Sequence, residues 1–179
     1  MWICRTIWLG ILLCSASSAM ALPEGKRTYV ADPTVDAHKT TVADAIDRTA
    51  KTFNFLFRGF VRSKLRSINP VYDHIVMEYT EPTLTLSSGN LAMSLTGVNL
   101  IGHPHTTPKG IQVTVDQEIK EWTVRRKYNA NNGYQEVLYT LDSELQTLTV
   151  EVSVGSRHFS TPMMHQLKYR LGPSTAEQQ

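Results

Sequence analysis

The longest stretch of helical periodicity in the chain extends over residues 41–68. Apolar side chains recur there every three or four residues, which places them on one face of an α-helix. They are Val42, Ile46, Ala50, Phe53, Phe57, Val61, Leu65 and Ile68. Thr41 and Asp44 form a variant of the capping box that predicts the start of the helix, and Asn69, which precedes a proline, predicts its end. Gly59 is the predicted position of a kink. One long amphipathic helix is therefore expected, with a single face that needs a partner.

The chain after Pro70 alternates between apolar and polar residues with a period of two, which is typical of strands with one buried face. About eight such segments follow one another, and the clearest cover residues 148–154 and 163–171. Short turn signals such as Asn131-Asn132-Gly133 separate neighbouring segments. This pattern predicts an α+β domain in which the long N-terminal helix packs on a curved, barrel-like antiparallel meander of about eight strands.

Residues 1–21 have the features of a secretory signal peptide. Arg5 is followed by a short apolar run, and Ala19-Met20-Ala21 is suited to cleavage. We therefore expect an exported protein, periplasmic or secreted and bacterial. Residues 22–40 contain two prolines and no periodicity, which predicts an extended arm; residues 41–171 are predicted to form the single domain and residues 172–179 a polar tail.

Composition narrows the possible partners. The chain has 18 basic and 16 acidic residues, and this near balance indicates no nucleic-acid partner. Both cysteines lie within residues 1–21, so no disulfide is predicted in the domain. No later segment is apolar over the roughly 20 residues that a membrane-spanning helix requires, so no transmembrane segment is predicted.

The run of antiparallel strands resembles the architecture of the lipocalins, which are small ligand-carrying barrels. No Gly-x-Trp motif stands near a first strand, and Trp122 lies in the middle of the meander. The resemblance is therefore one of architecture, which does not by itself carry function.

Candidate chemistry is sparse. His103 and His105 alternate in a predicted loop over residues 102–110 and are weak candidates for metal ligands, because a zinc site needs further protein ligands. Neither a Gly-x-Ser-x-Gly motif nor a glycine-rich phosphate loop occurs. No cofactor and no catalytic residue are predicted. The alternative that retains an enzyme is a metal-assisted hydrolase that uses His103 and His105.

A charged triplet, Arg125-Arg126-Lys127, lies within one predicted strand. Side chains alternate between the faces of a strand, so at most two of the three point the same way. An edge strand that resists aggregation is the predicted reason for these charges.

We expect a non-enzymatic binding protein of the cell envelope that holds a small apolar or amphipathic ligand between helix and sheet. Five aromatic residues are the predicted lining: Phe53, Phe57, Trp122, Tyr139 and Tyr169. Phe53 and Phe57 are expected to face the sheet, and the alternative is that all five pack as core. A second alternative is a structural or partner-binding envelope subunit that uses the outer face of the helix, where an extra phenylalanine lies among cations. Oligomeric state cannot be predicted from these patterns.

Overall fold

The computed structural model describes residues 22–107 and 109–173, and within them it has two helices and ten strands. The helices are α1 (Val35–Lys51) and α2 (Phe55–Ile68). The strands are β1 (Gly25–Asp32), β2 (His74–Thr80), β3 (Thr83–Ser88), β4 (Leu91–Thr96), β5 (Asn99–Thr106), β6 (Gln112–Lys120), β7 (Thr123–Ala130), β8 (Gly133–Leu141), β9 (Thr147–Ser156) and β10 (Met163–Leu171). The predicted signal peptide and residues 174–179 of the predicted tail lie outside the described residues.

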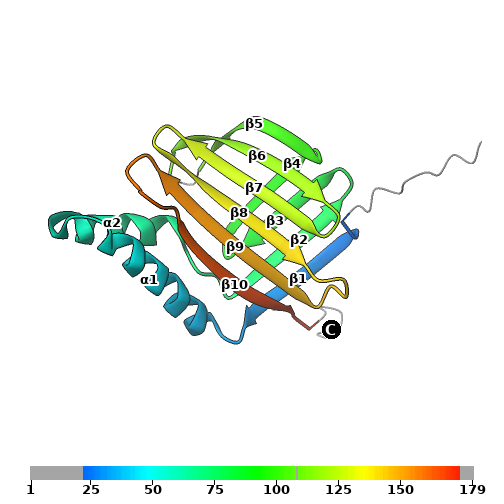
Figure 1. The fold of residues 1–179 in the computed structure, drawn as a ribbon. Coiled ribbons are helices and arrows are strands. Elements are labelled where there is room, and N and C mark those ends of the chain that lie inside the picture. Colours follow the sequence, from blue (N-terminus) through cyan, green and yellow to red (C-terminus); the bar gives the residue numbers. More distant parts are fainter. Residues whose placement is uncertain (1–21, 108, 174–179) are drawn as a thin grey trace, which may run out of the picture.

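The strands form a single antiparallel sheet that curves into a half-barrel (Figure 1). Its strand order is β4-β3-β2-β1-β10-β9-β8-β7-β6-β5. Sequential neighbours pair along β2 to β4 and along β5 to β10, and β1 joins the two groups by pairing with β2 and β10. The prediction of a curved antiparallel meander with a helical layer is confirmed, but the sheet has ten strands rather than about eight.

The two additional strands are β1 and β5. Residues 22–40, predicted as an extended arm, contain β1 and the start of α1, so this segment supplies an inner strand of the sheet. Prolines at 23 and 33 and the charged pair at 26–27 hide its pattern. The predicted loop that contains His103 and His105 lies largely in β5, where Gly102, Pro104 and a register shift interrupt the alternation.

The helical stretch is divided into two helices, which corrects the prediction of one. α1 begins at Val35 rather than Thr41, because the hydroxyl of Thr34 accepts a hydrogen bond from a first-turn backbone N–H at 3.2 Å. The break falls at residues 52–54, where the side chain of Asn54 caps α2 in the same way at 3.2 Å. Gly59, the predicted kink, lies inside α2. The predicted end at Asn69 is confirmed.

Polar contacts hold the two helices together. Arg58 donates from Nε to the carbonyl of Phe53 at 3.1 Å and from Nη2 to that of Lys51 at 3.2 Å, which satisfies carbonyls at the end of α1. Arg62 of α2 pairs with Asp47 of α1 at 2.7 Å. The pair of helices is therefore held as one unit.

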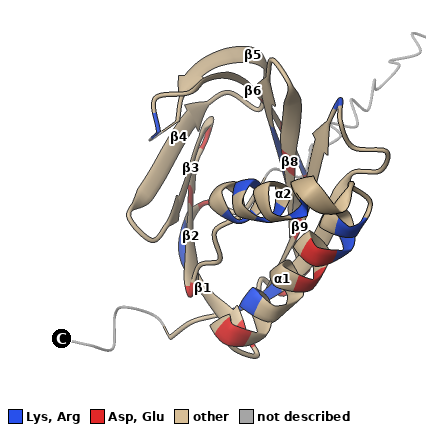
Figure 2. Ribbon diagram, turned by 90° about the vertical axis from the view of Figure 1, so that its left-hand side faces the viewer, with Lys and Arg blue, Asp and Glu red and all other residues tan. Residues whose placement is uncertain are grey.

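α1 lies along β10, and α2 lies across the open end of the half-barrel (Figure 2). Near one end of α1, the ring of His38 meets that of Tyr169 edge to face, with centroids 4.9 Å apart. Beyond its other end, Phe53 meets Phe159 at 5.5 Å. Neither described helix has the length and apolar character needed to cross a membrane.

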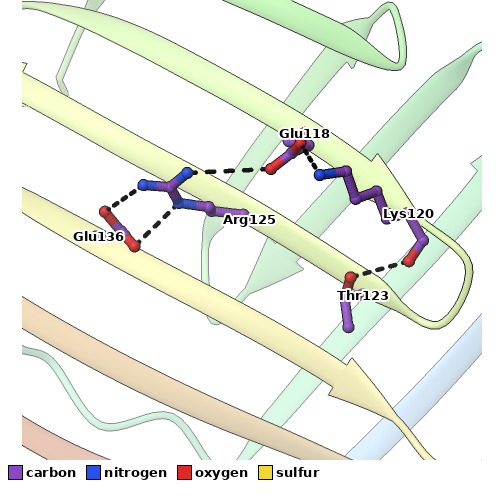
Figure 3. Close-up of polar contacts among 5 residues, drawn as sticks. All are labelled: Glu118, Lys120, Thr123, Arg125 and Glu136. Atoms are coloured by element: carbon purple, nitrogen blue, oxygen red, sulfur yellow. Dashed lines mark hydrogen bonds and ion pairs between the residues drawn. The ribbon is translucent and has the colours of Figure 1, made fainter.

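The charged triplet divides between the two faces of the sheet. Arg125 points outward, where its guanidinium pairs with Glu136 at 2.9 Å and, at 3.9 Å, with Glu118, which also binds Lys120 (Figure 3). The edge-strand explanation is wrong, because β7 lies inside the sheet between β6 and β8. Arg126 points inward, and its position leads to the candidate site.

Candidate ligand-binding interior

The face of the sheet toward the helices, here called the inner face, is mainly apolar. Strand β9 shows the pattern most simply, because buried residues alternate with partly or fully exposed ones over residues 147–154. The register aligns these buried positions with inward positions on β8 and β10. The buried apolar residues of β8, β9 and β10 are Val137, Leu141, Leu148, Val150, Val152, Val154, Met163, Leu167 and Tyr169. They form one core with the buried side chains of both helices.

One row of aligned residues on this face is polar at both ends. The register places Gln117 opposite Arg126, Arg126 opposite Val137, Val137 opposite Val152, and Val152 opposite His165. We call these five residues the inner row. The next row toward the β6–β7 turn consists of Ile119, Val124, Tyr139, Val150 and Leu167. Two valines therefore separate the polar residues at the two ends of the inner row, and the mainly apolar next row borders them.

Arg126 is a buried cation with neutral partners. Its side chain is 1% exposed. Nε donates to Oε1 of Gln117 at 2.8 Å, Nη1 to the carbonyl of Met93 at 3.3 Å, and Nη2 to the carbonyl of Leu84 at 3.0 Å. Among the described residues no acidic side chain forms an ion pair with it. Burial lowers the pKa of Arg126, but a guanidinium stays protonated in proteins, so the interior carries a positive charge.

These contacts also join distant parts of the sheet. Five strands separate β7 from β3 in the strand order, yet Arg126 on β7 reaches backbone carbonyls on β3 and β4. Gln117 extends the connection, because its Nε2 donates to the carbonyl of Gly97 at 2.9 Å. The guanidinium therefore spans the interior of the half-barrel. A guanidinium has five N–H donors, and three take part in these bonds.

His165 occupies the far end of the inner row. Its side chain is 9% exposed, and within the described part of the chain its Nδ1 has no hydrogen-bond partner. Burial lowers its pKa to about 4, so the imidazole is neutral near pH 7. Three strand spacings of about 4.8 Å put Arg126 and His165 at most roughly 14 Å apart along the sheet. The two polar groups could therefore contact a single medium-sized molecule.

Two of the five predicted lining residues lie on the inner face. Tyr139 is partly buried against the core, and its burial raises the pKa of its hydroxyl. Tyr169 is buried, with a pKa raised to about 12 for the same reason, and its hydroxyl donates to the carbonyl of Tyr72 at 3.4 Å. Tyr139 lies in the row next to Arg126, and Tyr169 lies one row further.

The other three predicted residues lie in turns or on α2 rather than on the strands. Phe53, in the turn between the helices, is partly buried against the core and meets Phe159 edge to face. Phe57 is exposed rather than facing the sheet, because it lies in the first turn of α2, at the end of the helix away from the sheet (Figure 1). Trp122, in the turn before β7, is partly buried and also packs against the core. The structure therefore does not gather the five aromatic residues around one crevice.

The metal candidates lie on an edge strand. His103 and His105 point toward the same face of β5, two residues apart. Within residues 22–107 and 109–173, no group of three or more histidine, cysteine, aspartate or glutamate side chains is placed to hold a metal ion. The metal-assisted hydrolase has no third ligand in this part of the chain.

A separate cleft of about 300 Å³ lies among the turns at the strand ends. Its lining comprises Asn131, Asn132, Gly133, Tyr134, Gly155, Ser156, Arg157, Phe159 and Pro162. Tyr134 packs closely on Gly155 in this lining, since a Cβ added to Gly155 would come within 2.2 Å of the Tyr134 ring. This cleft is not formed by the inner row.

Sequence reasoning did not select Arg126, Gln117 or His165 as site residues. A signal for Arg126 existed, because strand alternation places it on the same face as the apolar Val124. His165 similarly alternates with Met163 and Leu167. A polar residue in phase with an apolar face was the pattern that could have identified both.

Comparisons with known proteins give a likeness of shape. No family model and no curated protein matches the sequence. A Schistosoma mansoni fatty-acid-binding protein solved with arachidonic acid aligns with TM-score 0.48 and 14% identity, over 86% of this chain and 98% of that one. An Echinococcus granulosus fatty-acid-binding protein aligns with TM-score 0.45 and 9% identity, over 83% of this chain and 96% of that one. A Drosophila melanogaster brain fatty-acid-binding protein aligns with TM-score 0.40 and 12% identity, over 80% of this chain and 95% of that one. With TM-scores below 0.5, these likenesses assign neither a family nor a ligand.

Proposed function

We propose that the protein is a non-enzymatic binding protein that holds an amphipathic ligand with an acidic head group on the inner face of the half-barrel. The observation that carries the proposal is the buried charge of Arg126, which has no acidic partner among the described residues. We further propose that the protein is exported, periplasmic or secreted, on the features of residues 1–21.

The energetics favour a ligand that brings a negative charge. A buried ion costs several kcal/mol of desolvation unless a counter-ion and good hydrogen bonds offset it. Carbonyl and amide oxygens stabilise Arg126 but leave its charge unbalanced. A carboxylate or phosphate near the two remaining N–H donors would form charge-assisted hydrogen bonds, which are about twice as strong as neutral ones.

The surroundings favour an apolar body on the same ligand. Val137 and Val152 separate Arg126 from His165 along the inner row, and the next row is apolar apart from the Tyr139 hydroxyl. If the head group of a ligand contacts Arg126, its apolar chain would pack against these side chains. That packing would stabilise the complex by about 25 cal/mol for each Å² of apolar surface buried. Nδ1 of His165, which has no protein partner among the described residues, would suit a second polar group. We propose Tyr139 and Tyr169 as part of the lining.

The test compares two probes with the same apolar chain. Oleate and oleyl alcohol are titrated into the purified protein in competition with a fluorescent fatty acid, and we expect oleate to bind at least about tenfold more tightly. Arg126→Gln should weaken oleate binding by about 10- to 150-fold, since hydrogen bonds to charged groups contribute about 1.5–3 kcal/mol. Binding of the alcohol should stay within a factor of three.

Arg125→Gln is the matched control, because it removes the same charge from the adjacent residue on the outer face. It should leave both affinities unchanged, and thermal unfolding confirms that each variant is folded. If Arg126→Gln does not fold, Gln117→Leu replaces it: this variant keeps the guanidinium and frees Nε, so the preference for oleate should persist. Equal affinity of the parent for the two probes, or no binding of either, overturns the proposal.

A further inference from the structure

α2 presents large apolar side chains to solvent where the helix begins. Phe55, Leu56, Phe57 and Phe60 are 71%, 71%, 59% and 72% exposed. They fall within the first six residues of α2, at the end next to the turn that joins it to α1. Figure 1 shows this end at the outer tip of the helical pair, away from the sheet. We call these four residues the apolar tip.

The packing of α2 explains why three of these four side chains are exposed. Val61 and Leu65 are the buried residues of α2, and they fix which side of the helix faces inward. With about 100° per residue, Phe55, Leu56 and Phe60 fall within an arc of about 140° centred on the opposite side. Phe55, Leu56 and Phe60 are therefore exposed as a consequence of how α2 docks, and they cannot turn inward unless Val61 and Leu65 turn outward. Phe57 lies on the same side of the helix as Val61, but in the first turn, where it is also exposed.

The same helix is uniformly cationic. It carries Arg58, Arg62, Lys64 and Arg66 and no acidic residue, and Figure 2 shows this contrast with α1, which carries both signs. Arg62 pairs with Asp47. Lys64 and Arg66 are exposed and form no ion pair within the described part of the chain. Outside α2, Lys109 adds a cation by donating to the carbonyl of Ser67 at 2.9 Å.

We infer that α2 docks on an anionic lipid surface, with the apolar tip inserted at the boundary between head groups and acyl chains. Helices that lie on membranes combine exposed aromatic and aliphatic residues with lysine and arginine in this way. Charge complementarity selects this occupant over a second copy of the chain. Two copies joined through their tips would bring two uniformly cationic helices together, whereas an anionic surface neutralises them.

The test measures binding of the purified protein to large unilamellar vesicles by co-sedimentation. Vesicles of phosphatidylcholine with 30% phosphatidylglycerol are compared with vesicles of phosphatidylcholine alone. We expect at least tenfold tighter binding to the anionic vesicles, with most of the preference lost in 0.5 M NaCl because surface charges are then screened. Residues 1–21, where retained, are common to all variants, so their contribution cancels between parent and variant.

Two paired variants separate the charges from the apolar tip. Lys64→Gln with Arg66→Gln should weaken binding to anionic vesicles about 25-fold, at roughly fivefold per cation near the surface. Lys168→Gln with Arg170→Gln removes the same charge from exposed positions on β10 and should have little effect. Phe55→Ser with Phe60→Ser should weaken binding at least tenfold, whereas Ile101→Ser with Met164→Ser, at exposed apolar positions elsewhere, should not.

The substituted side chains are exposed, so circular dichroism and thermal unfolding should match those of the parent. Equal binding to neutral and anionic vesicles overturns the inference, as does absence of binding. Sedimentation equilibrium provides a further check. A concentration-dependent dimer that disappears in the Phe55→Ser, Phe60→Ser variant would assign the apolar tip to self-association instead. The vesicle measurements need no bound ligand, so they are independent of the oleate experiment.

Discussion

The buried hydrogen bond between Arg126 and Gln117 can be measured with a double-mutant cycle. The variants are Arg126→Met, Gln117→Leu and the two together, which replace both polar groups by apolar side chains of similar length. Nε donates to Oε1 at 2.8 Å, and both side chains are buried. Each single variant therefore leaves one buried polar group without its partner, and the double variant leaves neither.

The expected size follows from these contacts. A hydrogen bond to a charged group contributes about 1.5–3 kcal/mol, and a buried group left unsatisfied costs about 1–3 kcal/mol. Arg126 also loses its bonds to the carbonyls of Leu84 and Met93, but that loss occurs with and without Gln117 and cancels from the cycle. We expect a coupling free energy of about 2 kcal/mol, with the double variant more stable than the sum of the single effects predicts.

Urea unfolding followed by far-UV circular dichroism gives the four unfolding free energies. A coupling of about 2 kcal/mol corresponds to roughly 4–8 °C in Tm for a domain of this size. The parent and variants must share one m-value for the comparison to hold. A coupling free energy within about 0.5 kcal/mol of zero would refute the reasoning, because noninteracting sites give additive effects.

Three further predictions concern single residues. The pKa of His165 is about 4 in the folded state and 6.5 ordinarily. The unfolded chain therefore binds this proton at a higher pH than the folded protein does, so stability falls as the pH decreases from 6.5 to about 4. His165→Leu should remove roughly 2–3 kcal/mol of the stability difference between pH 7 and pH 4.5, measured by urea unfolding; an unchanged difference would contradict the burial. Gly59→Ala should stabilise the protein by up to about 1 kcal/mol in thermal unfolding, because an added Cβ on this helical residue meets nothing within 4 Å. Gly133→Ala should cost more than about 3 kcal/mol, because its Cβ would lie 2.3 Å from the carbonyl oxygen of Gly155, and a parent-like Tm would exclude this close approach.

The sequence predicted those elements whose signal is local. All eight segments with alternating residues are strands, and β9 and β10 bury the face that the alternation selects. The end of the helical region at Asn69 was also local, since the following proline restricts it. Strands and stops of this kind depend on neighbours within a few residues.

The elements that were missed depend on distant contacts. β1 is stabilised by pairing on both sides, with β2 and β10, although its sequence is flanked by prolines and is rich in charge. The helix break at residues 52–54 is favoured by the Asn54 cap and by Arg58, which binds carbonyls at the end of α1. Strong apolar periodicity across the break concealed it.

The candidate site was missed for a similar reason. The acceptors of Arg126 come from Gln117 and from strands β3 and β4, which are remote in sequence. Alternation alone placed Arg126 on the inner face, but composition made a solvent-exposed charge the simpler interpretation. Only the curvature of the sheet, which brings β3 and β4 opposite β7, shows how the guanidinium is accommodated.

The position of β1 has a consequence for the order of folding. The first strand pairs with the last, so the two groups of strands cannot be joined until the C-terminal segment is present. Pairings between remote segments are slow, because loop-closure entropy is lost before the contacts compensate. During synthesis, β1 and β9 would each expose an unpaired edge until β10 arrives. The complete sheet can therefore form only after residues up to Leu171, the end of β10, have been synthesised.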